Sequence, residues 1–144
     1  MVAFKNKRLQ KKFMFPETQT HTNKFKNILE KKPSLKYTIS DKLWIGHQER
    51  KKKNKKRGVG FGYAIFDEKS DFVNTISARY NKDGSEILIA QKNKNPTKLT
   101  PLEAARLQGF PDKIVKSALD SGVSEAQLYK QFGNAVPINV VRAI

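Results

Sequence analysis

The residues with the clearest chemical capacity in this chain are basic and clustered. Seven of the eight residues from Arg50 to Arg57 are Lys or Arg, and the eighth is Asn54. Charges at this density repel one another, whereas the phosphates of a polyanion bind them through ion pairs and hydrogen bonds. The sequence therefore predicts that residues 50–57 form a loop or a helix end that becomes ordered on phosphates. A nuclear-localisation signal is the alternative interpretation. The candidate contacts are Arg50, Lys51, Lys52, Lys53, Lys55, Lys56 and Arg57.

The net charge of +16 is concentrated in one part of the 144-residue chain. Residues 1–57 hold 18 Lys and Arg against 4 Asp and Glu, while residues 58–144 hold 11 against 9. This asymmetry indicates a polyanionic partner for the N-terminal part. The alternative is a lysine-rich surface that serves only solubility, because net charge bears on both properties.

The residue types exclude several other chemistries. The chain has no cysteine, which removes disulfides, thiolate zinc sites and a nucleophilic thiol. His21 and His47 have no partner at metal-ligand spacing, so we assign no metal site. No stretch has the pattern of an export signal or the length of a membrane span, and we therefore expect a cytoplasmic protein with no membrane association.

Glycine stands at every second position in Gly58-Val-Gly-Phe-Gly-Tyr63. This is not the dinucleotide-binding fingerprint, because the third glycine comes too early and no long apolar strand precedes it. We predict a strand whose glycine face lets another backbone, including that of DNA, come close. Phe61, Tyr63 and Ile65 alternate on the other face, as in a half-buried strand.

The N-terminal part of the sequence has only weak signals for the helices and strands that must position these residues. Met1–Phe4 is a possible short strand, and residues 24–32 have the spacing of a short amphipathic helix that Pro33 would end. We expect Trp44 in the core. Residues 74–80 and 86–90 have strand-like composition, and Asp83-Gly84 between them predicts a β-hairpin.

The C-terminal part carries strong helix signals. Thr100, Pro101 and Glu103 form a capping box with proline at the first helical position, and Gly109 would close that helix. A second helix is expected over residues 112–119, ending near Gly122. A third would begin at Ser124, run toward Phe132 and be broken by residues 133–134. The apolar stretch 138–144 follows.

Two blocks in this region resemble the last two sequence motifs of the DNA (cytosine-5) methyltransferases. They are the stretch from Leu99 to Pro111 and the stretch Tyr129-Lys-Gln-Phe-Gly-Asn-Ala-Val-Pro137. Residues 75–78, Thr-Ile-Ser-Ala, are similar to the family's target-recognition signature. The wider stretch 60–89 looks most like bacterial members that protect short GC-rich restriction sites.

The resemblance implies an enzyme that transfers a methyl group from S-adenosylmethionine to carbon 5 of cytosine in duplex DNA. The family's catalytic cysteine in a Pro-Cys motif, its acid and its main donor-binding motif would lie upstream of Met1. A chain without cysteine would then need an N-terminal methyltransferase subunit or segment that carries the Pro-Cys motif, and we assign no catalytic residue here.

The resemblance also assigns roles to individual positions. Thr97 stands where the family usually has arginine, and Ala135 replaces a common serine. The matching positions are Thr75, Ser77, Arg79 and Tyr80 for DNA contact, Asn134, Ala135 and Val136 for the border of the donor pocket, and Thr100, Glu103 and Arg106 for organising the recognition region.

The expected fold class is α+β. A small, mostly β target-recognition region at residues 1–97, basic in its N-terminal half, would be followed by C-terminal helical motifs at 98–144 that pack on an absent doubly wound α/β domain. Apolar side chains at 136–144 would then face a partner. A stand-alone DNA-binding module or regulator is the second hypothesis, and a basic RNA-associated protein of ribosomal type is the third.

Overall fold

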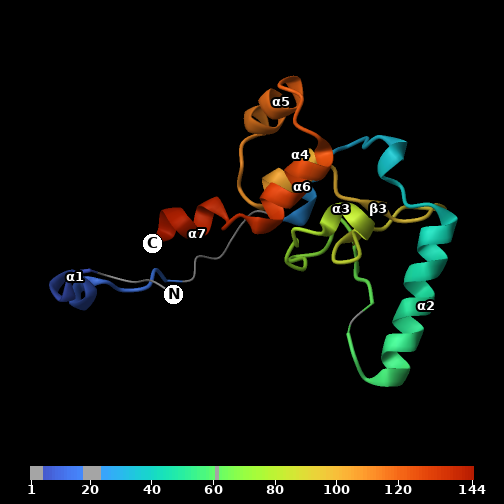
Figure 1. The fold of residues 1–144 in the computed structure, drawn as a ribbon, viewed down its shortest axis with the longest axis horizontal. Coiled ribbons are helices and arrows are strands. Elements are labelled where there is room, and N and C mark those ends of the chain that lie inside the picture. The colour runs from blue at the N-terminus through green and yellow to red at the C-terminus, as the bar shows by residue number, and fades with distance from the viewer. Residues whose placement is uncertain (1–4, 18–23, 61) are drawn as a thin grey trace.

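A computed structural model describes residues 5–17, 24–60 and 62–144 of the chain (Figure 1). The predicted strand at Met1–Phe4, His21 and Phe61 lie outside these residues. The helices are α1 (Lys7–Lys12), α2 (Asp41–Arg57), α3 (Tyr80–Asp83), α4 (Pro101–Leu107), α5 (Asp112–Asp120), α6 (Glu125–Asn134) and α7 (Ile138–Ala143), with 3-10 helices η1 (Phe25–Asn27) and η2 (Leu35–Tyr37). The strands are β1 (Ile65–Phe66), β2 (Leu88–Ile89) and β3 (Thr97–Lys98).

The α+β class is confirmed, but the expectation of a mostly β recognition region is wrong. The sheet consists of two-residue strands in the order β1-β2-β3. Strand β1 pairs parallel with β2, with Ile65 opposite Leu88, and β2 pairs antiparallel with β3. A single bridge joins Thr38 to Thr97, and Thr97 is buried at the position where the family usually has arginine. Helices and extended segments make up most of the described chain.

The predicted β-hairpin between residues 74 and 90 does not form. Residues 80–83 fold instead into the short helix α3, and Gly84 closes it in the left-handed conformation (φ 63°), with its N–H donating to the carbonyl of Tyr80 at 3.0 Å. A left-handed glycine serves a helix C-terminus as well as a hairpin turn. Burial decides between them here, because Tyr80 is completely buried in the core.

Helix α2 contains the basic run that we expected to be a loop or helix end. Ser40 caps its start by accepting the N–H of Leu43 at 3.3 Å, and Gly58 (φ 65°) closes its end. Lys55, Lys56 and Arg57 occupy the last turn, where the negative end of the helix dipole stabilises cations. These local interactions explain why a run of like charges is helical here.

The helices predicted in the C-terminal part are confirmed. Helix α4 has the complete capping box of Thr100 and Glu103, and Gly109 (φ 80°) follows its end. Helix α5 ends just before Gly122 (φ 83°). Ser124 caps α6, but α6 continues through residues 133 and 134 and gives way to extended backbone at Ala135.

Two smaller expectations need correction. Residues 24–32 form only the single turn η1, from which Phe25 enters the core, while Ile28 and Leu29 are half-buried against it. Trp44 is half-buried rather than a core residue, and its ring packs edge-on against Tyr63 with the centroids 4.9 Å apart.

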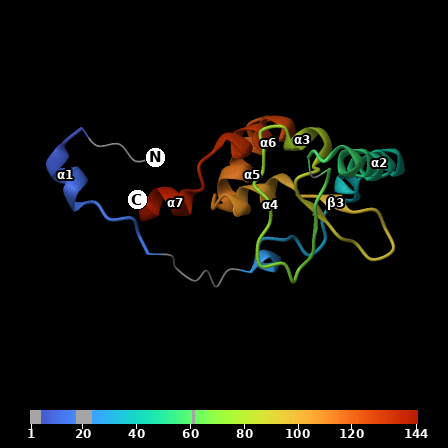
Figure 2. The same ribbon diagram turned by 90° about the horizontal axis from the view of Figure 1, so that it is seen from below.

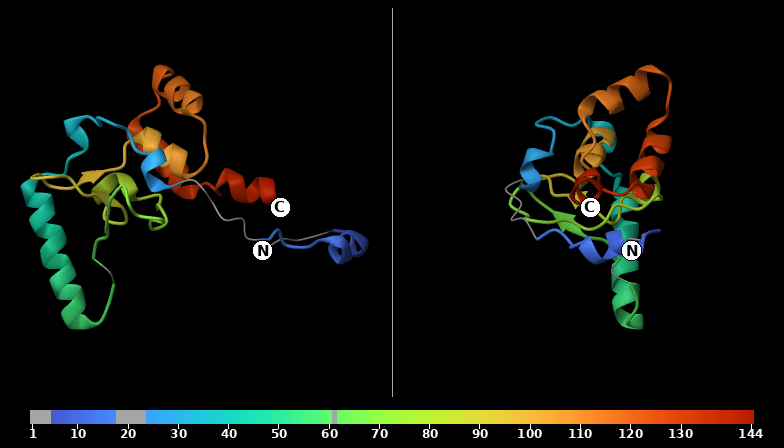
Figure 3. Two further views of the ribbon diagram at one scale, coloured as in Figure 1. Left: turned by 180° about the vertical axis from the view of Figure 1, so that it is seen from behind. Right: turned by 90° about the vertical axis from the view of Figure 1, so that its left-hand side faces the viewer.

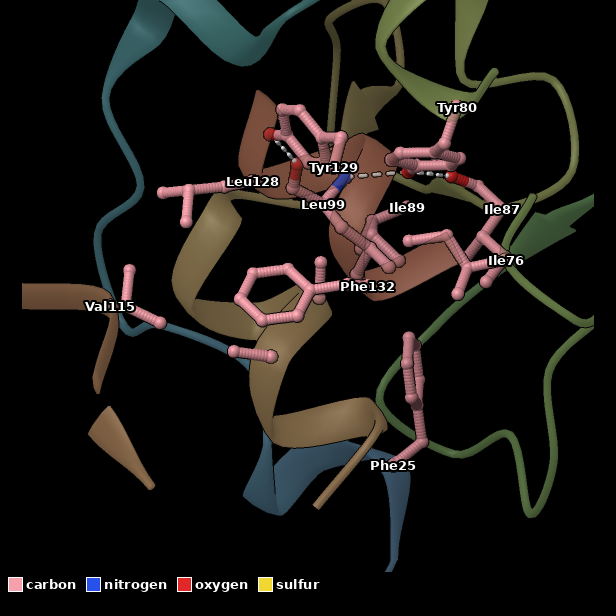
Figure 4. Close-up of a cluster of buried hydrophobic side chains, with 12 residues drawn as sticks. Phe25, Ile76, Tyr80, Ile87, Ile89, Leu99, Val115, Leu128, Tyr129 and Phe132 are labelled. Carbon is pink, nitrogen blue, oxygen red and sulfur yellow. Dashed lines mark hydrogen bonds between the residues drawn. The ribbon is translucent and has the colours of Figure 1, made fainter. Parts of the chain in front are cut away.

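Two tyrosines bind the backbone N–H and C=O of a single residue, Leu99, at the centre of the core (Figure 4). The N–H of Leu99 donates to the hydroxyl of Tyr80 at 2.8 Å, and the hydroxyl of Tyr129 donates to the carbonyl of Leu99 at 2.6 Å. Tyr80 also donates to the carbonyl of Ile87 at 2.6 Å. Burial raises the pKa of both phenols above the ordinary range, which keeps them as neutral donors. The two side chains thereby join α3, α6 and the start of α4.

Around this centre, α6 packs against α3 and α4, and α4 packs against α5 (Figure 1). Side chains from both sides of the predicted boundary at residue 97 share the core, among them Ile76 and Phe132. The division into two regions stays a prediction. Helix α1 lies apart from α4–α6 on the side where α7 ends (Figure 2). No helix of the described residues has the length and apolar character needed to cross a bilayer.

Candidate nucleic-acid interface

Helix α2 projects from the body of the protein, and its C-terminal end lies far from α4–α6 (Figures 1 and 3). At 100° per residue, the 17-residue helix divides into an inner face, which includes Trp44, His47 and Arg50, and an outer face. The inner face contacts Gly62 and Tyr63, which follow the end of the helix. We call α2 together with residues 59–60 and 62–63 the arm, and the five exposed basic side chains that follow Lys51 in the helix the arm face. The arm face comprises Lys52, Lys53, Lys55, Lys56 and Arg57.

A polar cluster fixes the base of the arm. Arg50 donates to a carboxylate oxygen of Asp83 at 2.9 Å, to Nδ1 of His47 at 2.8 Å and to the carbonyl of Gly62 at 3.2 Å. Because a guanidinium only donates, Nδ1 of His47 accepts, and Nε2 carries the hydrogen that reaches the carbonyl of Asp83 at 3.1 Å. His47 is 1% exposed. Arg50 is therefore committed to the fold and is not part of the arm face.

The charge on Asp83 belongs to the same cluster. Its partial burial opposes ionisation, but hydrogen bonds from Arg50 and Ser85 outweigh that effect and hold the pKa of the carboxyl below its ordinary value. No role for His47 was predicted from the sequence, where its one signal is a position three residues before Arg50, which puts both side chains on neighbouring parts of the helix surface.

Lys51 and Gly62 bring the two halves of the arm together. The ammonium of Lys51 lies 4.3 Å from the centre of the Tyr63 ring and 3.4 Å from the Tyr63 carbonyl. A Cβ on Gly62 would stand 2.7 Å from the Cα of Lys51, so only glycine fits there. Close backbone approach at a glycine was expected, but the partner is the protein's own helix. The described residues of the predicted strand, 58–60 and 62–63, are not in strand conformation, because Gly60 and Gly62 have φ of 63° and 81°.

A surface hollow of about 670 Å³ lies where the arm meets the predicted recognition segment. Lys51 and Tyr63 line it from the arm, and Asn74, Thr75 and Glu86 line it from the body. The structure thus brings one residue of the basic run beside the first residue of the Thr-Ile-Ser-Ala signature, although 24 positions separate them in the sequence.

The recognition segment comprises residues 74–79: its first part has no regular structure, residues 78–79 form a turn that leads into α3, and the side chains of Thr75 and Arg79 are exposed. Ser77 is half-buried, donates its hydroxyl to Glu86 and accepts the N–H of Arg79 at 3.2 Å. Tyr80, which we expected to contact DNA, is 0% exposed and has its hydroxyl occupied by Ile87 and Leu99. Tyr80 therefore belongs to the core and supports the segment from behind.

The end of α6 lies directly against the recognition segment. A Cβ on Gly133 would stand 2.2 Å from the carbonyl carbon of Ser77 and 2.3 Å from the nitrogen of Ala78. Gly133, which we predicted to break the helix, instead lets α6 pack on that peptide. Of the three predicted donor-pocket residues that follow, Asn134 and Val136 are exposed and Ala135 is half-buried.

The three polar residues assigned to α4 connect distant parts of the chain. Glu103, 2% exposed, accepts the N–H of Glu30 and the N–H of Thr100, each at 2.8 Å. Thr100 also donates its hydroxyl to the Glu30 carboxylate at 2.6 Å. Arg106 donates twice to Asp112, at 2.8 and 2.6 Å, and once to the carbonyl of Ile28 at 3.1 Å.

These contacts bring residues 28–30 onto the first turn of α4. Burial raises the pKa of the Glu103 carboxyl, whereas the hydrogen bonds from Arg106 lower the pKa of Asp112. The contact of residues 28–30 with α4 was missed from the sequence, because two of its three hydrogen bonds use backbone groups, the N–H of Glu30 and the carbonyl of Ile28, which leave no side-chain signal. Within the described residues, no group of three or more His, Asp or Glu side chains is arranged to hold a metal ion.

Comparison with known proteins places this geometry in a family. The profile of the C-5 cytosine-specific DNA methylases matches residues 1–144. The chain is 55% identical to the Type II methyltransferase M1.ScrFI of Lactococcus lactis subsp. cremoris and 56% identical to M.NlaX of Neisseria lactamica, in each case over 92% of this chain. It spans 33% and 41% of the lengths of those two relatives.

Solved structures show the same fold at low sequence identity. A crystal structure of the Schizosaccharomyces pombe Dnmt2 methyltransferase superposes with a TM-score of 0.66 at 17% identity, over 88% of this chain and 42% of that one. The Entamoeba histolytica methyltransferase EhMeth gives a TM-score of 0.68 at 19% identity, over 99% and 42%. The family profile matches the full length of the chain and the bacterial relatives align over 92% of it, so the chain belongs to the C-5 cytosine-specific DNA methylase family.

Proposed function

We propose that this chain supplies the DNA-recognition region and the closing motifs of a bacterial cytosine-5 DNA methyltransferase of the restriction–modification type. The relatives that are named Type II methyltransferases support the class. The observation that carries the proposal is the packing of Gly133 on the peptide between Ser77 and Ala78. It puts the segment that would meet DNA beside the loop that would border the methyl donor.

In this proposal, the chain binds and orients the DNA. Thr75 is exposed and lines the hollow, and Arg79 is exposed four residues later, so a hydroxyl is available to a phosphate and a guanidinium to a phosphate or a base edge. Ser77 holds the segment in place through Glu86. Because carbon 5 of a stacked cytosine is out of reach, the target base must leave the duplex before methyl transfer.

Asn134, Ala135 and Val136 would border the donor S-adenosylmethionine, which supplies the methyl group. They offer an exposed amide, an exposed apolar side chain and extended backbone at Ala135. That set fits one edge of a nucleoside site and lacks an enclosing wall within the described residues. The remaining walls would come from the partner described next.

The attack on carbon 6 of cytosine requires a thiolate, and this chain has no cysteine. We propose that an N-terminal methyltransferase subunit or segment with a Pro-Cys motif and a doubly wound α/β fold supplies it in the cytoplasm. The C-terminal end offers that partner an apolar surface, because Val136, Val141 and Ile144 are 60%, 60% and 55% exposed.

Reconstitution tests this function. The chain is co-expressed in a methylation-deficient bacterial host with the N-terminal segment that the alignment leaves uncovered in M.NlaX, and cytosine methylation is mapped by bisulfite sequencing. We expect methylation at one short site with both polypeptides and none with either alone. The control is the same partner with its Pro-Cys cysteine changed to alanine. Absence of methylation while the two polypeptides copurify would contradict the proposal.

A stand-alone DNA-binding module is the second candidate, favoured by an arm that is folded within this chain alone. It predicts that the isolated chain prefers one duplex sequence over others at ~0.2 M salt, where contacts to phosphates alone are weakened. Binding that ignores sequence and disappears with salt would contradict this candidate.

A further inference from the structure

The arm face has charges that the fold leaves unused. Its five basic side chains are exposed, and none of them forms an ion pair within the described residues. The basic side chains that do form ion pairs there are Lys36, Arg50 and Arg106, and all three lie outside the arm face. Glu49 is the one acidic residue in α2 beyond its first turn. The arm face is therefore a concentrated cationic surface that is available to a partner.

The arm face is also held in a fixed position. Arg50 and His47 attach the middle of α2 to Asp83, Lys51 lies on Tyr63, and the N–H of Val59 donates to the carbonyl of Asn54 at 3.0 Å. A disordered basic tail would lose conformational entropy on meeting an anion. This helix is already ordered, so its charges are presented at a set distance from the hollow.

That distance can be compared with the dimensions of DNA. Lys51 lines the hollow, and Arg57 lies six residues further along the helix. At 1.5 Å per residue this is about 9 Å. The phosphates of one strand are spaced by about 3.4 Å along the duplex axis, so an arm face that lies parallel to this axis would span about two to three phosphates. The face lies immediately beyond the hollow, where a duplex held by Thr75 and Arg79 would continue.

We propose that the arm face binds the phosphate backbone of duplex DNA just outside the recognised site, without reading its sequence. This inference rests on the proposed function. It adds the DNA on either side of the target site as something that the chain binds. Lys52, Lys53 and Lys56 have flexible ammonium groups, which suit point contacts with phosphates better than base readout.

The test uses the reconstituted complex of this chain with its N-terminal partner and the double variant K52Q/K56Q. Both positions lie on the outer face, and glutamine has nearly the helix propensity of lysine, so α2 should stay folded. Affinity is measured for duplexes that carry the methylated site with flanks of 2 or 12 base pairs, over a range of salt concentrations. The matched control is K113Q/K116Q, which removes two exposed lysines from α5.

We expect the wild-type complex to bind the long duplex several-fold more tightly than the short one, and K52Q/K56Q to bind both about equally. The slope of log affinity against log salt on the long duplex should fall by about 1.8 in the variant, because each phosphate contact contributes about 0.9. K113Q/K116Q should keep the wild-type slope and the wild-type preference for long flanks.

The outcomes separate the two proposals. If the wild-type complex neither methylates nor binds the site, the proposed function fails. If specific binding persists but K52Q/K56Q keeps both the slope and the flank preference, the inference about the arm is overturned. It is also overturned if the double variant loses affinity only for an RNA duplex of equal length, since the partner would then be RNA.

Discussion

Helices α2 and α4 begin in the same way and use their charges differently. Each starts at a hydroxyl residue whose side chain accepts a backbone N–H, Ser40 in α2 and Thr100 in α4. In α4, Glu103 is buried and bonded to two backbone groups. In α2, the basic side chains beyond residue 51 are exposed and form no ion pair within the described part of the chain. Local capping fixes where both helices lie, and burial decides which charged groups remain available to a partner.

The largest contrast is expected between two helical glycines. Changing Gly133→Ala in α6 would drive a Cβ into the Ser77–Ala78 peptide, so the free energy of unfolding should fall by about 3 kcal/mol. Changing Gly46→Ala in α2, where nothing lies within 4 Å, should raise it by up to ~1 kcal/mol. Urea unfolding of both variants measures the difference. Equal effects would show that the close packing of α6 has no energetic weight.

The next effect concerns Glu103. In Glu103→Gln one of the two accepted N–H groups loses its acceptor, which should cost about 2 kcal/mol at neutral pH. Burial raises the pKa of this carboxyl, so the folded state binds its proton more tightly than the unfolded state. Stability of the wild type should therefore fall as pH rises from about 4.3, the unfolded value, through the folded pKa.

Glu103→Gln removes that decline, because the amide does not titrate. Unfolding followed at several pH values tests this, with the exposed Glu49→Gln in α2 as the control that changes charge without changing a buried contact. If the free energy of unfolding of Glu103→Gln fell with pH in parallel with that of the wild type, the decline could not be assigned to Glu103.

The caps offer a smaller and more direct comparison. Thr100→Ala should cost about 2 kcal/mol, because the hydroxyl also donates to Glu30 in a buried site. Ser40→Ala should cost about 1 kcal/mol, since its single bond lies at the surface. Thermal unfolding distinguishes the two. A larger loss in Ser40→Ala would mean that the arm depends on its cap more than α4 does.

The smallest expected change is at the base of the arm. The pKa of Asp83 is held down by Arg50 and Ser85 against its partial burial, so its contribution to stability is present above about pH 3.9 and is lost as pH falls through the folded pKa. Both partners are partly exposed, at 41% and 31%, and Asp83→Asn should therefore cost less than about 1 kcal/mol at neutral pH. The difference from wild type should vanish in acid. A constant difference at all pH values would assign it to another cause.

The sequence predicted those elements whose signals are local. Helix α4 needs only Thr100, Pro101, Glu103 and Gly109 to set both ends, and all four lie within ten residues. The hairpin failed because Gly84 suits a turn and a helix end equally, and the choice depends on the burial of Tyr80 among α6 residues. Strand β2 found a parallel partner in β1, and no local pattern specifies that pairing.

The sequence predicted which stretch is basic, but it did not predict which of the basic side chains are exposed at the candidate interface. Arg50 and Lys52 are indistinguishable in the run, yet Arg50 turns inward because Asp83 and Gly62 accept from it. The sequence likewise did not show that Tyr80 is buried in the core while its neighbour Arg79 is exposed. In both cases the deciding partners come from other segments of the chain.

The backbone of Leu99, bound on its N–H by Tyr80 and on its carbonyl by Tyr129, is also a natural reporter of the whole fold. Its N–H can exchange with deuterium only when the bond to Tyr80 opens, and that requires α3 to separate from β3 and α6. Leu99 is 0% exposed, so small local fluctuations do not reach it. The exchange rate of this one amide therefore measures how often the entire core comes apart, whether or not a partner is bound.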